Sequence, residues 1–260
     1  MLKFKCQSEA VDQIEDLVKY DRHSILIEGP SGCGKSYLSK QFANLHRIED
    51  FQLINPTVDD IRSTVESFYT LKNKSVVCIE NLDLGVPGAS YSLLKFLEEP
   101  NDNAYVIVTC RNIKKVPETI LSRSACVSIN PPTAKDIYEY AFQKDPTQLQ
   151  IKSNSLVWNA VRSFTDVDNI FAMSIEQTDY YDKLSEKISF RDSISQLTWD
   201  LGHYPNNSES PSEYVFRCIM HLTTGNVRNA AIQCLNDLSL NRLAPHAVIA
   251  KFCFEAKYSE

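Results

Sequence analysis

The sequence predicts an α/β domain with a parallel sheet, followed by two smaller helical domains. Up to about residue 130, short apolar runs alternate with segments whose apolar residues recur every three or four positions. A glycine-rich GxxxxGK[ST] pattern lies between the first apolar run and the helix-like segment after it. Beyond residue 133 no convincing strand-like run follows. Strand–helix alternation of this kind is typical of a parallel sheet covered by helices.

Five short runs rich in Val, Ile or Leu are the candidate strands, and we expect them to be buried on both faces. They are Ser24–Glu28, Phe51–Ile54, Ser75–Ile79, Tyr105–Thr109 and Cys126–Ile129. The segments between them carry apolar stripes at helical spacing. The stripes are Val11, Ile14 and Val18, then Ile61, Val65 and Phe68, then Leu93, Leu94 and Leu97.

The α/β unit ends at a pair of prolines, Pro131 and Pro132. Thr133 and Asp136 follow with the spacing of a capping box, which predicts a helix start. We therefore expect helical segments from this point onward.

Three domains are predicted, with bounds at 1–130, 131–183 and 184–260. Pro211 and Pro245 are expected at helix starts in the last of them. At 260 residues a single core is near its upper size limit, so one larger and one or two smaller domains are expected.

Composition argues for an ordinary globular protein, with 43% hydrophobic and 23% charged residues. The formal net charge of -6 gives no basic footprint for nucleic acid. Any DNA contact must then come from a local basic stripe or from a surface shared by several subunits.

The eight cysteines show no CxxC pair and no zinc-ligand spacing. Cys78, Cys110 and Cys253 lie in apolar runs, where a reduced thiol behaves as a small hydrophobe. The N-terminus lacks an apolar stretch of signal-peptide length, and no run is long enough to span a membrane. A soluble, reduced, intracellular protein without a membrane partner is expected.

The strongest chemical signal is the phosphate-loop (P-loop) pattern. It consists of Gly29, Pro30, Ser31, Gly32, Cys33, Gly34, Lys35 and Ser36. Glycines let backbone N–H groups approach phosphate closely, at the start of a helix whose dipole favours anions. Lys35 supplies a positive charge to the outer phosphates, and the Ser36 hydroxyl can ligate Mg²⁺. The pattern predicts nucleotide binding.

The third candidate strand runs directly into Glu80, Asn81 and Asp83. A carboxylate at the end of a buried strand is where P-loop ATPases hold Mg²⁺ through their Walker B residue. On this pattern alone, an ordinary acidic turn is an equal alternative.

Four further segments select a family. They are Ile54–Arg62, Ser92–Pro100 with the sequence SLLKFLEEP, Tyr105–Thr109, and Val116–Arg123 with the sequence VPETILSR. In this order and spacing they resemble AAA+ sliding-clamp loader subunits, of the bacterial DNA polymerase III gamma and delta-prime type or the phage type. The resemblance covers about the first 130 residues, and SLLKFLEEP and ILSR speak against other AAA+ proteins such as helicase loaders.

The resemblance implies a doubly wound five-stranded AAA+ domain, a helical lid and a helical collar that joins subunits. It implies other loader subunits as partners, with a pentamer as the expected assembly, together with a sliding clamp and primer–template DNA. In that family ATP binds between neighbours in an open spiral, which opens the clamp and grips DNA. A cytoplasmic location follows.

The resemblance also assigns roles to residues. Lys35 and Ser36 would bind ATP and Mg²⁺, Glu80 would take the Walker B position, and Arg123 would be an arginine finger for a neighbour's site. The family's sensor 1 position falls on Arg111 or Asn112, because the match to the family pattern can be shifted by one residue there. Lys95 occupies a position that can face DNA in this family, although a solvated surface lysine is an equal alternative.

Two departures from the family pattern bear on catalysis. Asn81 stands where the family holds the carboxylate that polarises water, and an amide cannot accept the proton. Turnover is therefore expected to be slow, or the chain is a delta-prime-like stator that donates Arg123 without hydrolysing ATP. Asp83 is close enough in sequence to be considered a substitute. Sensor 2 is ambiguous, because Asp168 falls at its position and Arg228, after Gly225, fits better as part of a collar helix.

Overall fold

The computed structural model describes residues 5–99, 101–155, 158, 161–176, 178–179, 182–183, 220, 225–239, 248 and 251–252. Five parallel strands form one sheet in the order β2-β3-β4-β1-β5. They are β1 (Ser24–Glu28), β2 (Asp50–Ile54), β3 (Ser75–Ile79), β4 (Ala104–Cys110) and β5 (Ala125–Ser128). All five predicted strands are thus present, with ends that differ by at most one residue.

The helices of the sheet domain are α1 (Ser8–Lys19), α2 (Lys35–Leu45), α3 (Val58–Phe68), α4 (Pro87–Glu98) and α5 (Glu118–Leu121). Short 3₁₀ turns are η1 (Lys5–Gln7), η2 (Leu82–Leu84) and η3 (Ile113–Lys115). The helices that follow are α6 (Ala134–Lys144), α7 (Pro146–Lys152), α8 (Phe164–Ala172) and α12 (Gly225–Ser239). Among the described residues after β5 no strand is found.

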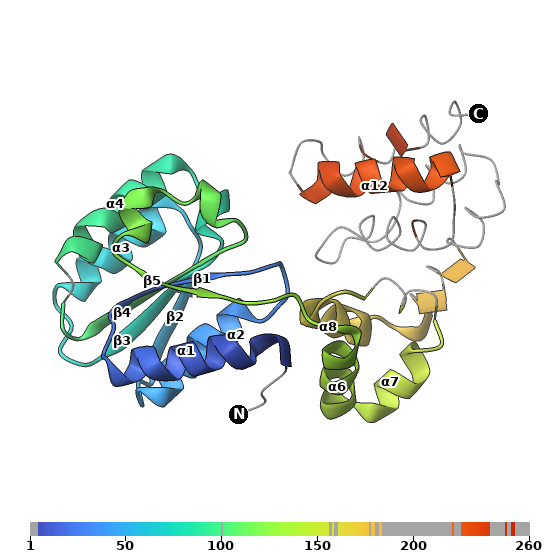
Figure 1. Ribbon diagram of the computed structural model, residues 1–260, viewed down its shortest axis with the longest axis horizontal. Coiled ribbons are helices and arrows are strands. Elements are labelled where there is room, and N and C mark those ends of the chain that lie inside the picture. Colours follow the sequence, from blue (N-terminus) through green and yellow to red (C-terminus); the bar gives the residue numbers. More distant parts are fainter. Residues whose placement is uncertain are drawn as a thin grey trace. The chain divides into compact units, whose positions relative to one another are not determined.

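Helices cover both faces of the sheet (Figure 1). An apolar cluster fills each of the two layers between sheet and helices. On one face Ile14 of α1 and Phe42 of α2 pack with Ile25. On the other face Ile61 of α3 and Leu93 of α4 pack with the neighbouring residue of β1, Leu26. Alternation of side chains along each strand therefore fills both layers. The predicted α/β fold with a parallel five-stranded sheet is confirmed.

The prediction that the strands are buried on both faces is confirmed for the central strands β3 and β4 but was wrong for the strands at the edges of the sheet. The residues of β3 and β4 are all buried. Along β2 only two of the five positions are partly covered, and Leu53 is 51% exposed. β2 and β5 lie at the ends of the strand order, so each has a partner on one side only. An apolar run therefore predicted the strand correctly without showing its place in the sheet.

The predicted capping box begins α6. Thr133 N donates to Asp136 Oδ2 at 2.9 Å, and Asp136 N donates to Thr133 Oγ1 at 3.2 Å. Reciprocal bonds of this kind satisfy two backbone donors at a helix start. The prediction is confirmed.

The chain divides into two compact units. One is Met1–Tyr138 with Ser163–Thr165, and the other is Glu139–Arg162 with the chain from Asp166 onward. The predicted bounds at 130 and 183 stay predictions, and Pro211 and Pro245 lie outside the described residues.

Cys78 and Cys110 are buried, as expected for small hydrophobes, and burial raises the pKa of each thiol to about 12. Cys253 lies outside the described residues. In the part of the chain that the structure describes, no three His, Cys, Asp or Glu side chains gather as a metal site would need. Nor does any described helix have the length and apolarity to cross a membrane.

Candidate nucleotide-binding site

The predicted P-loop connects the end of β1 to the start of α2. Gly32 and Gly34 have φ values of +70° and +95°, a left-handed backbone that glycine adopts readily. A Cβ atom on Gly34 would lie 2.3 Å from Gln7 Nε2, and one on Gly32 would lie 2.4 Å from Ser163 Oγ. Both conformation and space therefore require glycine at these two positions.

Two residues from distant parts of the sequence hold the loop. Gln7 Nε2 donates to Cys33 O at 2.7 Å, and Phe164 N donates to Gly32 O at 3.0 Å. Neither was singled out from the sequence. Each contact joins the loop to a segment that is remote along the chain, and no local pattern announces such a pairing.

The Lys35 ammonium lies within the loop itself. Its Nζ donates to Gly29 O and Pro30 O, both at 2.8 Å, and the residue is buried. Burial is the main cause that lowers the pKa of Lys35. Helix α2 begins at this residue without a side-chain cap, so its first N–H groups remain available to an anion.

Ser36 and Glu80 meet at the carboxyl ends of the strands. Ser36 Oγ donates a short hydrogen bond to Glu80 Oε1. This places one hydroxyl and one carboxylate oxygen together, which are ligand types that Mg²⁺ prefers. The two residues predicted for the metal are therefore brought together, although they follow different strands, β1 and β3.

Asn81 begins the turn after β3 in a left-handed conformation, with φ at +48°. Its N–H donates to Thr109 Oγ1 at 2.9 Å, which fixes the turn against β4. Asn tolerates this backbone region better than most residues.

Asp83 is engaged by the turn after β4. Its Oδ1 accepts from Arg111 N at 3.0 Å, and its Oδ2 accepts from Asn112 N at 3.2 Å. The carboxylate therefore orders the backbone of that turn. These contacts give no support to Asp83 as a substitute base.

The two sensor 1 candidates point differently. Asn112 Oδ1 accepts from Lys114 N at 3.0 Å and caps η3. Arg111 Nε lies 3.4 Å from Asn81 Oδ1, at the turn that follows Glu80. Of the two, only Arg111 has a side chain that bonds to the turn after β3 in the described part of the chain, and the choice of sensor 1 residue stays a prediction.

Arg123 follows α5. Among the described residues, it forms no hydrogen bond with the P-loop of its own chain. Its Nη2 donates to Glu98 Oε1 at 2.9 Å, and its Nη1 donates to Thr119 O at 2.8 Å. The side chain is 35% exposed. The guanidinium is therefore partly exposed at the surface of the sheet domain, and its role as a finger stays a prediction.

Neither sensor 2 candidate is placed at the phosphates by its contacts. Asp168 Oδ1 accepts a hydrogen bond from Tyr140 Oη at 2.7 Å and forms a short ion pair with Lys144. Burial, and then the hydrogen bond to Asp168, raise the pKa of Tyr140. Arg228 lies on α12, which begins at Gly225, so the interpretation as a glycine-started helix is confirmed.

The fold and this site define an α/β protein with a parallel five-stranded sheet and a P-loop after its first strand. A family model described as DNA polymerase III, delta subunit, matches residues 46–133. The DNA polymerase III subunit delta' of Bacillus subtilis (strain 168) is 26% identical over 171 residues, covering 54% of this chain and 52% of the relative. The delta' subunit of Haemophilus influenzae is 23% identical over 159 residues, covering 58% and 48%. The chain thus spans about half the length of these relatives.

Solved structures agree on the fold. A DNA polymerase III gamma subunit-related protein from Thermotoga maritima has a TM-score of 0.60 at 14% identity, covering 94% of this chain and 97% of that chain. A RuvB protein from Thermotoga maritima has a TM-score of 0.51 at 12% identity, covering 97% and 87%. The delta' relatives confirm the predicted resemblance to clamp-loader subunits, and the solved structures agree with the α/β fold.

Proposed function

We propose that this chain is an ATP-binding subunit of a DNA-polymerase sliding-clamp loader. In an oligomeric spiral it would help to open the clamp and place it on primer–template DNA, using ATP binding and hydrolysis. The observation that carries ATP binding is a P-loop that holds the Lys35 ammonium against its own carbonyls and whose Ser36 hydroxyl bonds to Glu80 after β3. The delta' relatives favour clamp loading over other tasks of P-loop proteins.

The residues present fit ATP with Mg²⁺. The cofactor-binding residues are Gly29, Pro30, Ser31, Gly32, Cys33, Gly34, Lys35 and Ser36. Their left-handed glycines, uncapped helix start and buried ammonium form an anion site. Ser36 and Glu80 would hold the metal, which neutralises phosphate charge when bound.

We assign Arg123 as the finger for a neighbour's site. Its guanidinium is outward and its only carboxylate contact among the described residues is to Glu98, which is 53% exposed. An exposed ion pair is weak and exchanges readily with another anion. A finger typically raises turnover by about 10³–10⁵.

Asn81 is the reason for an alternative form of this proposal, in which the chain binds ATP but hydrolyses it slowly or not at all. Because an amide cannot act as general base, turnover at this site should be slow by roughly 10²–10⁴ relative to a carboxylate. In the limit, the chain would be a delta-prime-like stator that binds ATP, donates Arg123 and does not hydrolyse. The intact P-loop supports the motor and Asn81 supports the stator.

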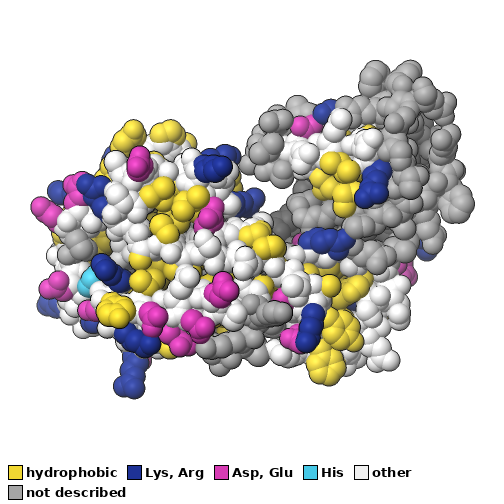
Figure 2. Space-filling model, viewed as in Figure 1, with side chains coloured by type: hydrophobic (Ala, Val, Ile, Leu, Met, Phe, Trp, Pro, Cys, Tyr) yellow, Lys and Arg dark blue, Asp and Glu magenta, His cyan; other side chains and the backbone are white. Residues whose placement is uncertain are grey.

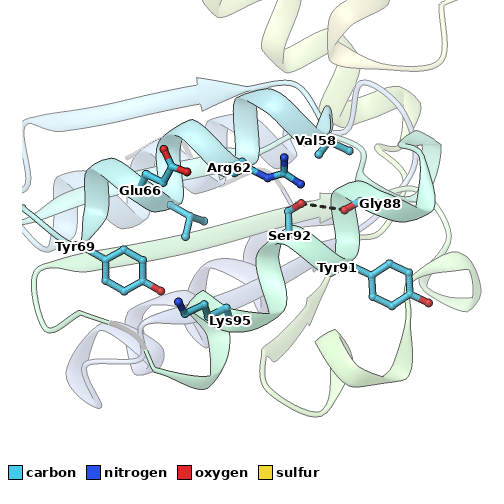
Figure 3. Close-up of a pocket in the computed structure, with 9 residues that line it drawn as sticks. Val58, Arg62, Glu66, Tyr69, Gly88, Tyr91, Ser92 and Lys95 are labelled. Carbon is cyan, nitrogen blue, oxygen red and sulfur yellow. Dashed lines mark hydrogen bonds between the residues drawn. The ribbon is translucent and has the colours of Figure 1, made fainter.

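A groove between α3 and α4 is the surface we propose for the DNA backbone. It has a volume of about 530 Å³ and is lined by Arg62, Tyr69, Tyr91 and Lys95, among others. Figure 3 shows Lys95 beside Tyr69, and its Nζ lies 5.7 Å from that ring's centroid. In the described part of the chain neither Arg62 nor Lys95 has an ion-pair partner, so both charges are available to phosphate.

The formal net charge of -6 limits the number of DNA phosphates that one chain can bind. On the face drawn in Figure 2, acidic and basic side chains are interspersed over the sheet domain. Glu66 lines the same groove as the two cations. Few phosphate contacts per chain are therefore expected, with tight binding only when several subunits act together. Removing Lys95 should lower the slope of log affinity against log salt by about one.

The remaining assignments follow the resemblance. Residues 131–183 would form the lid and 184–260 the collar that joins subunits, with a pentamer as the expected assembly. The partners would be other loader subunits, a sliding clamp and primer–template DNA, in the cytoplasm.

The decisive experiment is steady-state ATP hydrolysis by the chain alone and with co-purified partner subunits, with and without primed DNA and clamp. Hydrolysis that rises with DNA and clamp, and is lost in Lys35→Ala, establishes the motor. Tight ATP binding with no turnover in any combination establishes the stator. Unchanged ATP affinity in Lys35→Ala, with Lys40→Ala as the exposed control on the same helix, would overturn the nucleotide site itself.

A further inference from the structure

The groove between α3 and α4 presents aromatic and basic side chains together. Tyr69, at the C-terminal end of α3, is 45% exposed, and Tyr91 of α4 is 70% exposed. Arg62 of α3 and Lys95 of α4 line the same groove. Arg62 and Tyr69 are separated by two helical turns, and Tyr91 and Lys95 by one. Each helix therefore turns one aromatic and one cationic side chain to the groove.

These four side chains are spread along the groove. Figure 3 shows the two tyrosines toward opposite ends of the view, with Arg62 and Lys95 between them. The Lys95 ammonium lies 5.7 Å from the centroid of the Tyr69 ring. A single nucleic-acid strand carries a charged phosphate between successive bases, so a row of aromatic and cationic groups matches its chemistry.

The groove is narrow, and part of its floor is apolar. Helices α3 and α4 pack directly on each other, and the axes of packed helices lie about 8–10 Å apart. Val58 and Val65 line the groove and pack on the core beneath it. The bases of a duplex are stacked on one another, whereas unpaired bases can present their faces to an aromatic side chain. Exposed tyrosines in such a groove therefore favour one extended strand over a double helix.

Charge also favours a contribution from the bases. The groove holds Glu66 beside its two cations, and the formal net charge of the chain is -6. Binding through phosphates alone would be weak here and would fall steeply with salt. Stacking of a base on an aromatic ring is worth roughly 5- to 150-fold in affinity and does not depend on net charge. It is the contribution that an acidic chain can add.

We propose that the groove between α3 and α4 binds unpaired DNA, with Tyr69 and Tyr91 stacking on bases and with Arg62 and Lys95 holding the phosphates between them. The inference rests on the proposed function, which takes DNA as the partner of this groove, and it names the single-stranded part of that DNA as the occupant. Tyrosine and arginine are also frequent at protein interfaces. In the described part of the chain, however, neither cation has an ion-pair partner, and this favours a polyanion.

The test measures the affinity of the chain, alone and with co-purified partner subunits, for a short labelled oligothymidylate and for a blunt duplex of equal length. Fluorescence anisotropy at low salt gives both values. Tyr69→Ala and Tyr91→Ala should each lower the single-strand affinity by roughly 5- to 150-fold and leave the duplex affinity within about twofold. Tyr69→Phe and Tyr91→Phe keep the ring and should retain the single-strand affinity within about twofold. Tyr20→Ala is the control, because Tyr20 is 75% exposed at the end of α1, and it should change neither affinity.

Salt gives a second readout. If Arg62 and Lys95 each neutralise one phosphate, the slope of log affinity against log salt for the single strand should be about -1.4, and Lys95→Ala should flatten it by about 0.7. The two Tyr→Ala variants should lower the affinity at every salt concentration and keep the slope, because stacking releases no counterions.

The opposite results separate this inference from the proposed function. A single-strand affinity that is unchanged in both Tyr→Ala variants would overturn the inference. Release of a co-purified subunit by these variants, with the single-strand affinity kept, would make the groove a protein-binding surface and overturn it as well. Duplex binding that Lys95→Ala weakens while the tyrosine variants have no effect removes this inference alone. If neither Arg62→Ala nor Lys95→Ala changes the binding of either DNA, the DNA surface of the proposed function is removed too.

Discussion

Ser36 donates a hydrogen bond to Glu80, and this contact joins the start of α2 to the end of β3 across the intervening strand β4. Ligand sites of parallel α/β sheets lie at the carboxyl ends of the strands, where the loops after each strand meet. The pair therefore links the fold to its chemistry: the strand order brings the hydroxyl and the carboxylate together.

The first prediction concerns Mg²⁺. Glu80→Gln keeps the side-chain shape and removes the charge, so the gain in ATP affinity that Mg²⁺ provides should fall by roughly 10-fold or more. Binding measured in EDTA should change by no more than about twofold. Titration of ATP with and without Mg²⁺ gives both values.

Ser36→Ala should show the same loss of Mg²⁺ dependence, because the hydroxyl and the carboxylate serve one site. Glu66→Gln, an exposed carboxylate on α3, is the matched control for a change of net charge. Equal stimulation by Mg²⁺ in Glu80→Gln and in the unaltered chain would remove Glu80 from the metal site.

The second prediction concerns the P-loop backbone. Gly34→Ala places a side chain at φ +95° and 2.3 Å from Gln7 Nε2, so the loop must distort. We expect a loss of about 1–3 kcal/mol in the free energy of unfolding, measured in urea, together with weakened nucleotide binding. Gly88→Ala is the control, because Gly88 lies in α4 with an ordinary φ and an added Cβ would meet Val58 at 3.2 Å. A stability equal for the two variants would show that the loop tolerates the change.

The strands and the P-loop could be predicted from the sequence because both are local. Apolar runs such as Ser75–Ile79 report burial directly, and the spacing of the loop glycines reports a backbone conformation. Edge strands could not be told from central ones, because strand order depends on pairing between distant segments. Leu53 is apolar and exposed for this reason.

The site was predicted in part. Lys35, Ser36 and Glu80 carry motif positions, whereas Gln7 and Phe164 hold the loop through single contacts from far along the chain. The side chains of Arg111 and Asn112 make different contacts. An amino-acid sequence does not report the direction of a side chain, so the two sensor 1 candidates could not be told apart from it. Roles for these residues in catalysis and binding stay predictions.

The third prediction concerns pH. His46 packs against Phe42 and Tyr105, and its buried Nε2 has no hydrogen-bond partner among the residues that the structure describes. Burial lowers the pKa of His46, opposed by the charge of Asp21. Because the folded pKa lies below the unfolded value of about 6.5, the unfolded chain binds more protons. The stability that neutral His46 contributes is therefore present above pH of about 6.5 and lost as pH falls toward the folded pKa.

His46→Phe keeps the ring packing and removes the titration. The unfolding midpoint should therefore fall less steeply between pH of about 7 and 5 in His46→Phe than in the unaltered chain, measured by calorimetry. At neutral pH the two should agree within about 1 kcal/mol, because no hydrogen bond at Nε2 is lost. Identical slopes would show that the protonation of His46 does not limit stability.

The last prediction separates the two roles open to Arg123. Arg123 forms an ion pair with Glu98, and the two side chains are 35% and 53% exposed, respectively. Because exposed ion pairs contribute little, Arg123→Ala should change the free energy of unfolding by less than about 1 kcal/mol. In the assembled complex the same variant should lower ATP turnover by about 10³-fold or more while ATP binding by its own chain is kept. Glu98→Gln breaks the same ion pair but leaves the guanidinium, so its turnover should be at least that of the unaltered complex. A Glu98→Gln complex as slow as Arg123→Ala would show that the ion pair, rather than a finger, is what the assembly requires.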